Sequence, residues 1–250
     1  MTGLVREIVV HDVCLDDAVV LGGTGCAAEV DVACTRDGVA VVLPCAAHLA
    51  KETALRTVAD TPAKALDPAV FPPVEAALAA FGALGLPVVL DLKAGPGEEA
   101  RAATAVLAQV PRPGNTRVIG FNHRVVRLVS AQWGMAACGV LFAGLPMDVA
   151  AMATEAGSGW VVMQSRFLEP GLCAELRSRG IRTMTFSAST QKRWEEALAS
   201  GADSVMAEPD IAIAAAGGTS TTGGRVEPGS PAEPSAERAD ASGCHRPQWR

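Results

Sequence analysis

Short apolar, β-branched runs alternate along residues 7–215 with longer stretches in which apolar residues recur at helical spacing. Nine runs have the composition of buried strands: EIVVH, AAEVDVACT, GVAVVLP, LPVVLDLK, TRVIGF, CGVLFAG, GWVVMQ, IRTMTFS and DSVMAE. Between or after them, helices are predicted over Pro73–Leu84, Glu98–Gln109, Arg124–Trp133, Met147–Glu155, Pro170–Arg179 and Thr190–Ser200. The pattern is therefore strand followed by helix, repeated with short connections.

This alternation predicts a parallel sheet with helices on both faces, either a closed barrel or an open doubly wound sheet. The glycine-rich segment Gly22–Gly25 precedes an acidic strand. A dinucleotide-binding sheet places its glycines after an apolar strand and before a helix, so the open fold is disfavoured. We expect an α/β fold, a TIM-type (β/α)8 barrel of parallel strands over residues 7–215.

The composition changes after Ala215. The segment GGTSTTGGRVEPGSPAEPSAERADASG is rich in Gly, Ser, Pro and Glu and has no apolar period that could support packing. We therefore predict a disordered tail over residues 216–250.

Composition narrows the class of protein. An apolar share of 49% with 19% charged residues is enough to build one large core. A net charge of −6 without a Lys/Arg cluster argues against a nucleic-acid partner. The first residues have no apolar run of the length that a secretory signal or a membrane span needs, so we expect a cytoplasmic protein. The oligomeric state stays open.

The seven cysteines include no C-x-x-C pair that would indicate a zinc or redox site. Most of them are predicted to be small buried hydrophobic residues.

Four charged residues interrupt the apolar runs. Glu29 and Asp31 lie two apart in one predicted strand, and Asp91 and Lys93 lie two apart in another, so each pair shares a strand face. Strand ends of a barrel converge at one mouth, where three carboxylates would repel one another unless a hard cation lies among them. Glu29, Asp31 and Asp91 therefore predict a magnesium or calcium site, with Lys93 holding an anionic substrate oxygen. The alternative is a solvent-exposed acid and an ordinary ion pair.

The segment AAEVDVACTRDGVAVVLP resembles the second-strand signature of the glycerophosphodiester phosphodiesterase family, in which Glu-x-Asp-Val is followed by Thr-x-Asp-Gly. Further segments resemble that family in the same order: FPPVEAALAAF, VVLDLK, VIGFNHRVVRLV and RGIRTMTFSASTQKRWEEALASGADSVMAEPD. The resemblance covers residues 7–213, and the order and spacing of its pieces are more specific than any piece alone.

The resemblance implies a metal-dependent barrel that hydrolyses glycerophosphodiesters, in which two histidines act as general acid and base. By position, the metal ligands are Glu29, Asp31 and Asp91, with Asp91 in place of the usual Glu, and Lys93 binds phosphate. The expected partner is a small phosphodiester or another phosphate-containing ligand.

The family's histidines are mostly replaced in this chain. Pro44 and Cys45 stand where the family has a strand-ending His-Asp, and neither side chain can carry a proton as imidazole does. His11 ends the first strand, where the family has His-Arg-Gly, and Asp12 follows it in place of the Arg. His11 is therefore either a retained catalytic residue or a strand-end histidine, and Asp12 is expected to repel a phosphodiester.

Three functions remain open at this point. The first is a glycerophosphodiester phosphodiesterase whose activity is weak or lost. The second is a non-catalytic barrel that binds a phosphate-containing ligand or a protein partner, and the third is a different metal-assisted reaction of the lyase or cyclase type.

Overall fold

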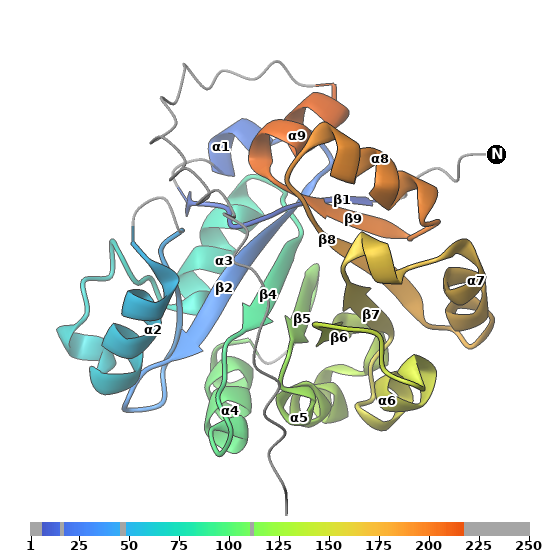
Figure 1. The fold of residues 1–250 in the computed structure, drawn as a ribbon. Helices are drawn as coiled ribbons and strands as arrows, with labels where there is room; N and C mark the ends of the chain where they lie inside the picture. The colour runs from blue at the N-terminus through green and yellow to red at the C-terminus, as the bar shows by residue number, and fades with distance from the viewer. Residues whose placement is uncertain (1–6, 16–17, 46–48, 111–112, 218–250) are drawn as a thin grey trace, which may run out of the picture. The chain divides into compact units, whose positions relative to one another are not determined.

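The computed structural model describes residues 7–15, 18–45, 49–110 and 113–217 of the chain (Figure 1). The predicted tail therefore lies, from residue 218 onward, outside the described residues.

Eight parallel strands close into a barrel. In order around the ring they are β1 (Glu7–Val10), β2 (Ala27–Cys34), β4 (Val88–Leu92), β5 (Thr116–Gly120), β6 (Cys138–Phe142), β7 (Trp160–Met163), β8 (Arg182–Ala188) and β9 (Ser204–Ala207). The ring closes because β1 pairs in parallel with both β9 and β2. The predicted parallel barrel is thus confirmed.

All nine predicted strands exist, but one of them is not part of the ring. The run GVAVVLP forms β3 (Ala40–Val42), which turns back and pairs antiparallel with the far end of β2. The hairpin extends β2 beyond its neighbours, so the segment that follows β3 begins near the C-terminal end of the barrel.

Helices connect the strands around the outside (Figure 1). The six predicted helices are α3 (Val74–Ala83), α4 (Glu99–Gln109), α5 (His123–Trp133), α6 (Val149–Glu155), α7 (Pro170–Ser178) and α8 (Gln191–Ala199). Three more helices were not predicted: α1 (Ala18–Leu21), α2 (Lys51–Asp60) and α9 (Pro209–Ala215). Short 3₁₀ turns lie at Ala63–Ala65, Met135–Ala137 and Ser165–Phe167.

Two of the three additional helices are too short to give a clear periodic signal, since α1 and α9 have only four and seven residues. Helix α2 does have an amphipathic pattern, with the buried Ala54 and Val58 one turn apart among polar residues, so it could have been predicted from the sequence. Among the described helices, none combines the length and the apolarity that crossing a membrane requires.

The barrel interior is a packed apolar layer. Side chains from all eight barrel strands form it: Val9, Ala27, Val89, Ile119, Leu141, Trp160, Val162, Met184 and Met206. Gly139 provides space in this layer, because a Cβ atom there would lie 2.9 Å from Ile119 Cγ2 and 3.1 Å from Trp160 Cβ. The interior is therefore filled like a core and is not a channel.

The N-terminal end of the barrel is closed by a stack of charged and aromatic side chains. The guanidinium carbons of Arg117 and Arg182 lie 4.6 Å and 4.0 Å from the ring centroid of Trp160. Arg117 also pairs with Glu7 at 2.5 Å. These contacts stabilise the N-terminal end of the barrel. The charged side chains at the C-terminal strand ends take no part in them, and they lie at the end where barrels of this kind carry their functional residues.

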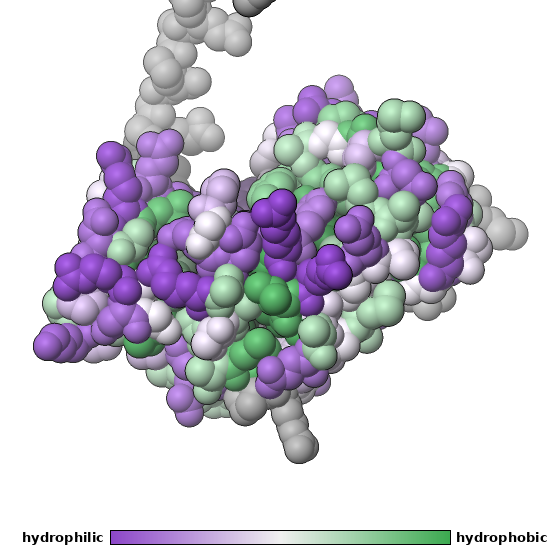
Figure 2. All heavy atoms as spheres, turned by 90° about the horizontal axis from the view of Figure 1, so that it is seen from below, coloured by the Kyte–Doolittle hydropathy of each residue, from purple (hydrophilic) through white to green (hydrophobic). Residues whose placement is uncertain are grey.

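The outer surface carries both hydrophilic and hydrophobic side chains. Seen from below the view of Figure 1, hydrophilic side chains surround a smaller hydrophobic area near the middle of the face (Figure 2).

Candidate active site

Three buried acids meet at the C-terminal end of the barrel. Asp31 of β2 lies opposite Asp91 of β4 in the parallel register, and Glu29 points the same way two residues earlier. Their exposed fractions are 1% for Glu29, 2% for Asp31 and 7% for Asp91. One carboxylate oxygen from each lies within 4.8 Å of the others. The structure thus brings together the three residues that the sequence pattern singled out.

The acid cluster has the properties of a site for a hard divalent cation. Asp91 Oδ1 is buried and has no hydrogen-bond partner among the described residues. Burial raises the pKa of Glu29 to about 8, and the charge of Asp31 adds to this effect. Burial also raises the pKa of Asp91. A cation bound by oxygen ligands would both satisfy the buried oxygen and remove the repulsion between the carboxylates, so these residues fit one.

Two lysines bind opposite oxygens of Asp31. Lys93 Nζ lies 3.0 Å from Asp31 Oδ1 and 2.5 Å from Asp91 Oδ2. Lys51, the first residue of α2, contacts Asp31 Oδ2 and lies 3.0 Å from Asp12 Oδ1. Sequence reasoning found Lys93 but missed Lys51, because a lysine on the surface of a helix carries no local signal of a contact twenty residues away.

The lysines and acids fix one another's charge states. Burial by itself would lower the pKa of each lysine, but the neighbouring carboxylates raise the pKa of Lys51 and of Lys93 above the ordinary value. Burial would likewise raise the pKa of Asp31, but the two ammonium groups lower it overall. Asp31 is therefore the ionised centre of the cluster.

His11 lies beside the acids. It follows the last residue of β1, with Nδ1 3.0 Å from Glu208 Oε1 and Nε2 3.9 Å from Glu29 Oε2. Burial by itself would lower the pKa of His11, but the hydrogen bond to Glu208 and the charge of Glu29 raise it. The hydrogen bond from His11 in turn lowers the pKa of Glu208. Glu208 was not predicted as a site residue, because only ring closure brings the end of β9 next to β1.

Asp12 contributes to the site through its backbone and its side chain. It has a φ of 55°, unusual for a residue other than glycine, and its N–H donates to Glu29 Oε2 at 2.9 Å. Its carboxylate pairs with Lys51. The expectation that Asp12 repels a phosphodiester did not include this lysine, which Asp12 shares with Asp31.

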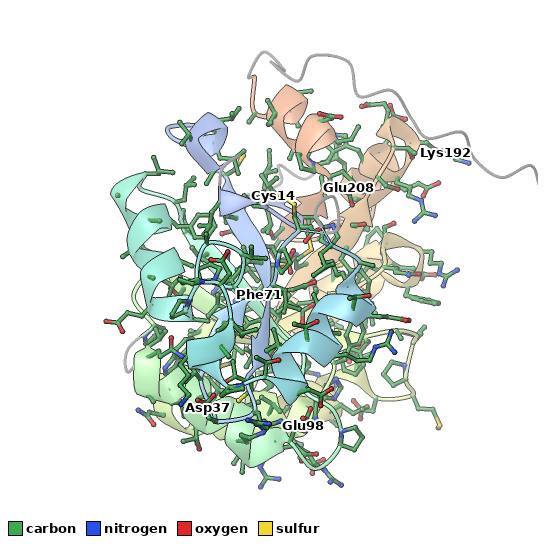
Figure 3. The ribbon with its side chains drawn as sticks, turned by 90° about the vertical axis from the view of Figure 1, so that its left-hand side faces the viewer. Cys14, Asp37, Phe71, Glu98, Lys192 and Glu208 are labelled. Atoms are coloured by element: carbon green, nitrogen blue, oxygen red, sulfur yellow. A yellow bond between two sulfur atoms is a disulfide. The ribbon has the colours of Figure 1, made fainter. Side chains whose placement is uncertain are left out.

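A disulfide joins the two segments that carry Asp12 and Lys51. Cys14 follows β1, and it is bonded to Cys45, which follows β3. Figure 3 shows the side chain of Cys14 in the same part of the molecule as that of Glu208, the partner of His11. This pairing was not predicted from the sequence. The expectation that most of the seven cysteines are small buried hydrophobic residues is met by four others, which are buried and free: Cys26, Cys34, Cys138 and Cys173.

A cavity of about 430 Å³ adjoins the acid cluster through Lys93. Leu55 of α2 and Leu92 of β4 contribute apolar surface to it, and Phe121 and Asn122 line it from the end of β5. Phe121 also packs edge to face on Phe186 of β8, with ring centroids 6.1 Å apart. The space beside the charged groups is thus large enough for a small organic ligand and has an apolar wall.

Comparison with known proteins bears on the fold. No protein-family model matches this sequence, and no curated protein sequence matches it. Solved structures do match. A phosphodiesterase from Oleispira antarctica, in complex with the product sn-glycerol-3-phosphate, has a TM-score of 0.66 at 15% identity, covering 85% of this chain and 96% of its own.

Two further solved structures agree with the first. A glycerophosphodiester phosphodiesterase from Parabacteroides distasonis has a TM-score of 0.65 at 16% identity, with 84% of this chain and 96% of its own covered. Another, from Thermotoga maritima, has a TM-score of 0.55 at 16% identity, with 80% and 93% covered. The chain therefore has the (β/α)8 barrel fold of glycerophosphodiester phosphodiesterases, which confirms the predicted resemblance at the level of fold.

Proposed function

We propose that this protein is a metal-dependent phosphodiesterase that acts on a small glycerol phosphodiester. The observation that carries the proposal is the convergence of Glu29, Asp31 and Asp91, with an unpartnered oxygen on Asp91, beside Lys93. A neighbour of the same fold binds sn-glycerol-3-phosphate, which supports a ligand of this class.

The residues would divide the work as follows. Glu29, Asp31 and Asp91 would hold a magnesium or calcium ion, which would supply positive charge next to the phosphoryl oxygens. Lys93, whose ammonium group lies beside Asp31 and Asp91, would bind a phosphate oxygen of the substrate. His11 moves a proton: Glu208 holds Nδ1, so Nε2 is the nitrogen directed to the acid cluster.

Full hydrolysis by this class of mechanism uses a base for the nucleophile and an acid for the leaving alcohol. Of the two histidines that the structure describes, only His11 contacts the cluster, since His123 Nε2 lies 2.9 Å from the carbonyl oxygen of Leu141. Pro44 stands where the family has its second imidazole, and the described residues place no other histidine at the cluster. The loss of one positioned proton-transfer group typically costs about 10²–10⁴-fold in rate, so we expect slow turnover.

A cyclising reaction is the second candidate, and it is favoured because the described part of the chain brings one imidazole, that of His11, to the acid cluster. The substrate's own neighbouring hydroxyl oxygen would form a bond to phosphorus while the bond from phosphorus to the leaving alcohol breaks. His11 would accept the hydroxyl proton and return it to the leaving oxygen, so one histidine is sufficient and no water is consumed. A non-catalytic barrel that binds a phosphate-containing ligand is the remaining alternative.

Cation binding and turnover together test the proposal. Calcium and magnesium binding are measured by calorimetry on wild type, Asp31→Asn and the control Asp60→Asn, which changes an exposed acid at the end of α2. Turnover of glycerophosphocholine and of bis(p-nitrophenyl) phosphate is measured on the same proteins. We expect binding and turnover in wild type and in the control, and loss of both in Asp31→Asn.

The other results separate the alternatives. A cyclic phosphate product, detected by phosphorus NMR, would favour the cyclising reaction over hydrolysis. Cation binding without turnover would favour the binding protein. A wild type that binds neither cation would contradict the metal site itself.

A further inference from the structure

Lys51 reaches the acid cluster from outside the barrel. It begins α2, in the excursion between β3 and β4, and its side chain is 30% exposed although its ammonium group contacts the buried Asp31. An ammonium group has three donors, and contacts with Asp12 and Asp31 use two of them. Beyond these two contacts with described residues, the partly exposed ammonium group of Lys51 keeps one further donor.

Lys51 and Lys93 are placed symmetrically about one carboxylate. Lys51 contacts Oδ2 of Asp31 and Lys93 contacts Oδ1. A divalent cation bound by the acid cluster would take over the neutralisation of Asp31, and it would compete with Lys51 for that oxygen. The ammonium group would then be available to an anionic ligand held next to the cation.

The position of Lys51 depends on a covalent connection between two segments. Cys14 lies two residues after Asp12, and Cys45 lies six residues before Lys51, so the disulfide holds Lys51 close to its partner Asp12. A free lysine side chain loses considerable rotamer entropy when it is ordered. Because the disulfide anchors the backbone near both residues of the ion pair, the Lys51 side chain has fewer conformations to lose when it is ordered against Asp12.

We propose that Lys51, held against Asp12 by the Cys14–Cys45 disulfide, is a second phosphate-binding residue of this site. It supplies from α2 a positive charge next to His11, where the β1 segment itself offers only the acid Asp12. The inference rests on the proposed function, because it assumes that the ligand carries a phosphate group.

The test measures binding of sn-glycerol 3-phosphate by calorimetry, with saturating calcium or magnesium, to wild type, Lys51→Met, Lys51→Arg and the control Lys64→Met, which changes an exposed lysine in the same excursion. Lys51→Met should bind sn-glycerol 3-phosphate about tenfold or more weakly, as expected for the loss of one hydrogen bond to a charged group. Lys51→Arg should restore much of the affinity, and the control should match wild type.

In Lys51→Met, the affinity for the cation should change in the opposite direction to the affinity for the phosphate ligand. Because Lys51 competes with the cation for Asp31, Lys51→Met should bind calcium or magnesium more tightly than wild type while it binds the phosphate ligand more weakly. A general loss of structure would weaken both. Unchanged phosphate affinity in Lys51→Met would overturn the proposal, whatever the turnover.

The disulfide is tested by the double variant Cys14→Ser/Cys45→Ser, and by reduced against oxidised wild type should that variant not fold. Each should lose phosphate affinity as Lys51→Met does, and adding Lys51→Met should cause little further loss, because the changes act through one contact. Wild-type affinity after removal of the disulfide would overturn its positioning role.

Failure of the proposed function gives a different result. A wild type that binds the cation and sn-glycerol 3-phosphate but turns over neither diester contradicts the phosphodiesterase, yet a selective loss of phosphate binding in Lys51→Met would still support Lys51. A wild type that does not bind sn-glycerol 3-phosphate overturns the role of Lys51, whether or not it turns over either diester.

Discussion

Asp31 and Asp91 lie side by side on neighbouring parallel strands, in register and buried, with Lys93 Nζ between their carboxylates at 3.0 Å and 2.5 Å. Two acids in this arrangement, with the buried Glu29 beside them, produce a concentration of carboxyl groups where water is largely excluded, so ionisation of all three is unfavourable. The behaviour of the whole site toward cations, protons and phosphate follows from that concentration.

Cation binding should depend on pH through Glu29. Burial raises the pKa of Glu29 to about 8, so without a cation this carboxyl group is protonated at neutral pH and a bound cation must displace the proton. Below pH 8 the affinity should fall by about tenfold per pH unit, and above it the affinity should level off. Calorimetry between pH 6 and pH 9, in buffers of different ionisation enthalpy, measures both the affinity and the proton released.

Glu29→Gln is the matched control for this dependence. It should bind the cation more weakly at every pH and lose the step near pH 8. An affinity of the wild type that is flat between pH 6 and pH 9 would contradict a protonated Glu29.

The same carboxyl group affects the stability of the cation-free protein. A buried acid with a raised pKa favours its neutral form in the folded state. Its contribution to the free energy of unfolding is therefore fully present below 4.5, the pKa of this group in the unfolded chain, and is lost as the pH rises toward about 8. The urea midpoint of wild type should therefore fall over this range more than that of Glu29→Gln.

His11 should be needed for turnover and not for cation binding. Its ring is held by Glu208 and lies 3.9 Å from Glu29 without belonging to the acid cluster. His11→Asn should lower turnover of bis(p-nitrophenyl) phosphate by about 10²–10⁴-fold and leave calcium affinity within a few-fold of wild type. His123→Gln, which changes a histidine bonded to the Leu141 carbonyl group, should retain activity. Equal activity in His11→Asn and wild type would assign His11 to a structural role.

Gly139 should be required inside the barrel. A methyl group there would approach Ile119 Cγ2 to 2.9 Å and Trp160 Cβ to 3.1 Å, so Gly139→Ala should destabilise the fold by about 1–3 kcal/mol. Gly144→Ala is the control, because a Cβ atom at that position meets no atom within 4 Å. Urea unfolding of the two variants decides the matter, and equal midpoints would show that the interior is less tightly packed than the structure has it.

The Cys14–Cys45 disulfide should stabilise the folded protein. It closes a loop with a sequence separation of 31, for which loop-closure entropy gives about 4 kcal/mol. Reduction should lower the urea midpoint accordingly.

Burial raises the pKa of Cys138 to about 12, so this thiol should not react with alkylating reagents until the protein unfolds.

Mass mapping after alkylation in denaturant, with and without reductant, identifies the pair. Protection of Cys14 and Cys45 without reductant is the expected result, and their alkylation under those conditions would contradict the bond. A structural disulfide is typical of proteins that mature in an oxidising compartment, which differs from the cytoplasmic location expected from the N-terminal residues. Mapping on protein isolated from its native host would decide between the two.

The local periodicities of the chain predicted a parallel α/β sheet with charged residues inside its strands, and the position of Gly22–Gly25 together with the family resemblance favoured the closed barrel. Buried parallel strands are nearly continuous in apolar residues, so Glu29, Asp31, Asp91 and Lys93 stand out as charged residues inside such runs. Because side chains alternate between the two faces of a strand, the two residues of each pair share a face and point into the mouth of the barrel. These four assignments needed only the direction of side chains on neighbouring strands, which is a property of each strand and its register.

Lys51, Glu208 and the Cys14–Cys45 pair were decided by the tertiary structure. Lys51 meets Asp31 only because the β2–β3 hairpin sends α2 back over the mouth, and Glu208 meets His11 only because β9 closes on β1. No periodicity encodes such contacts, since they depend on the path of the connecting segments and on ring closure. The same holds for Asp12, which in the sequence is a negative charge beside the site and in the folded chain is half of an ion pair.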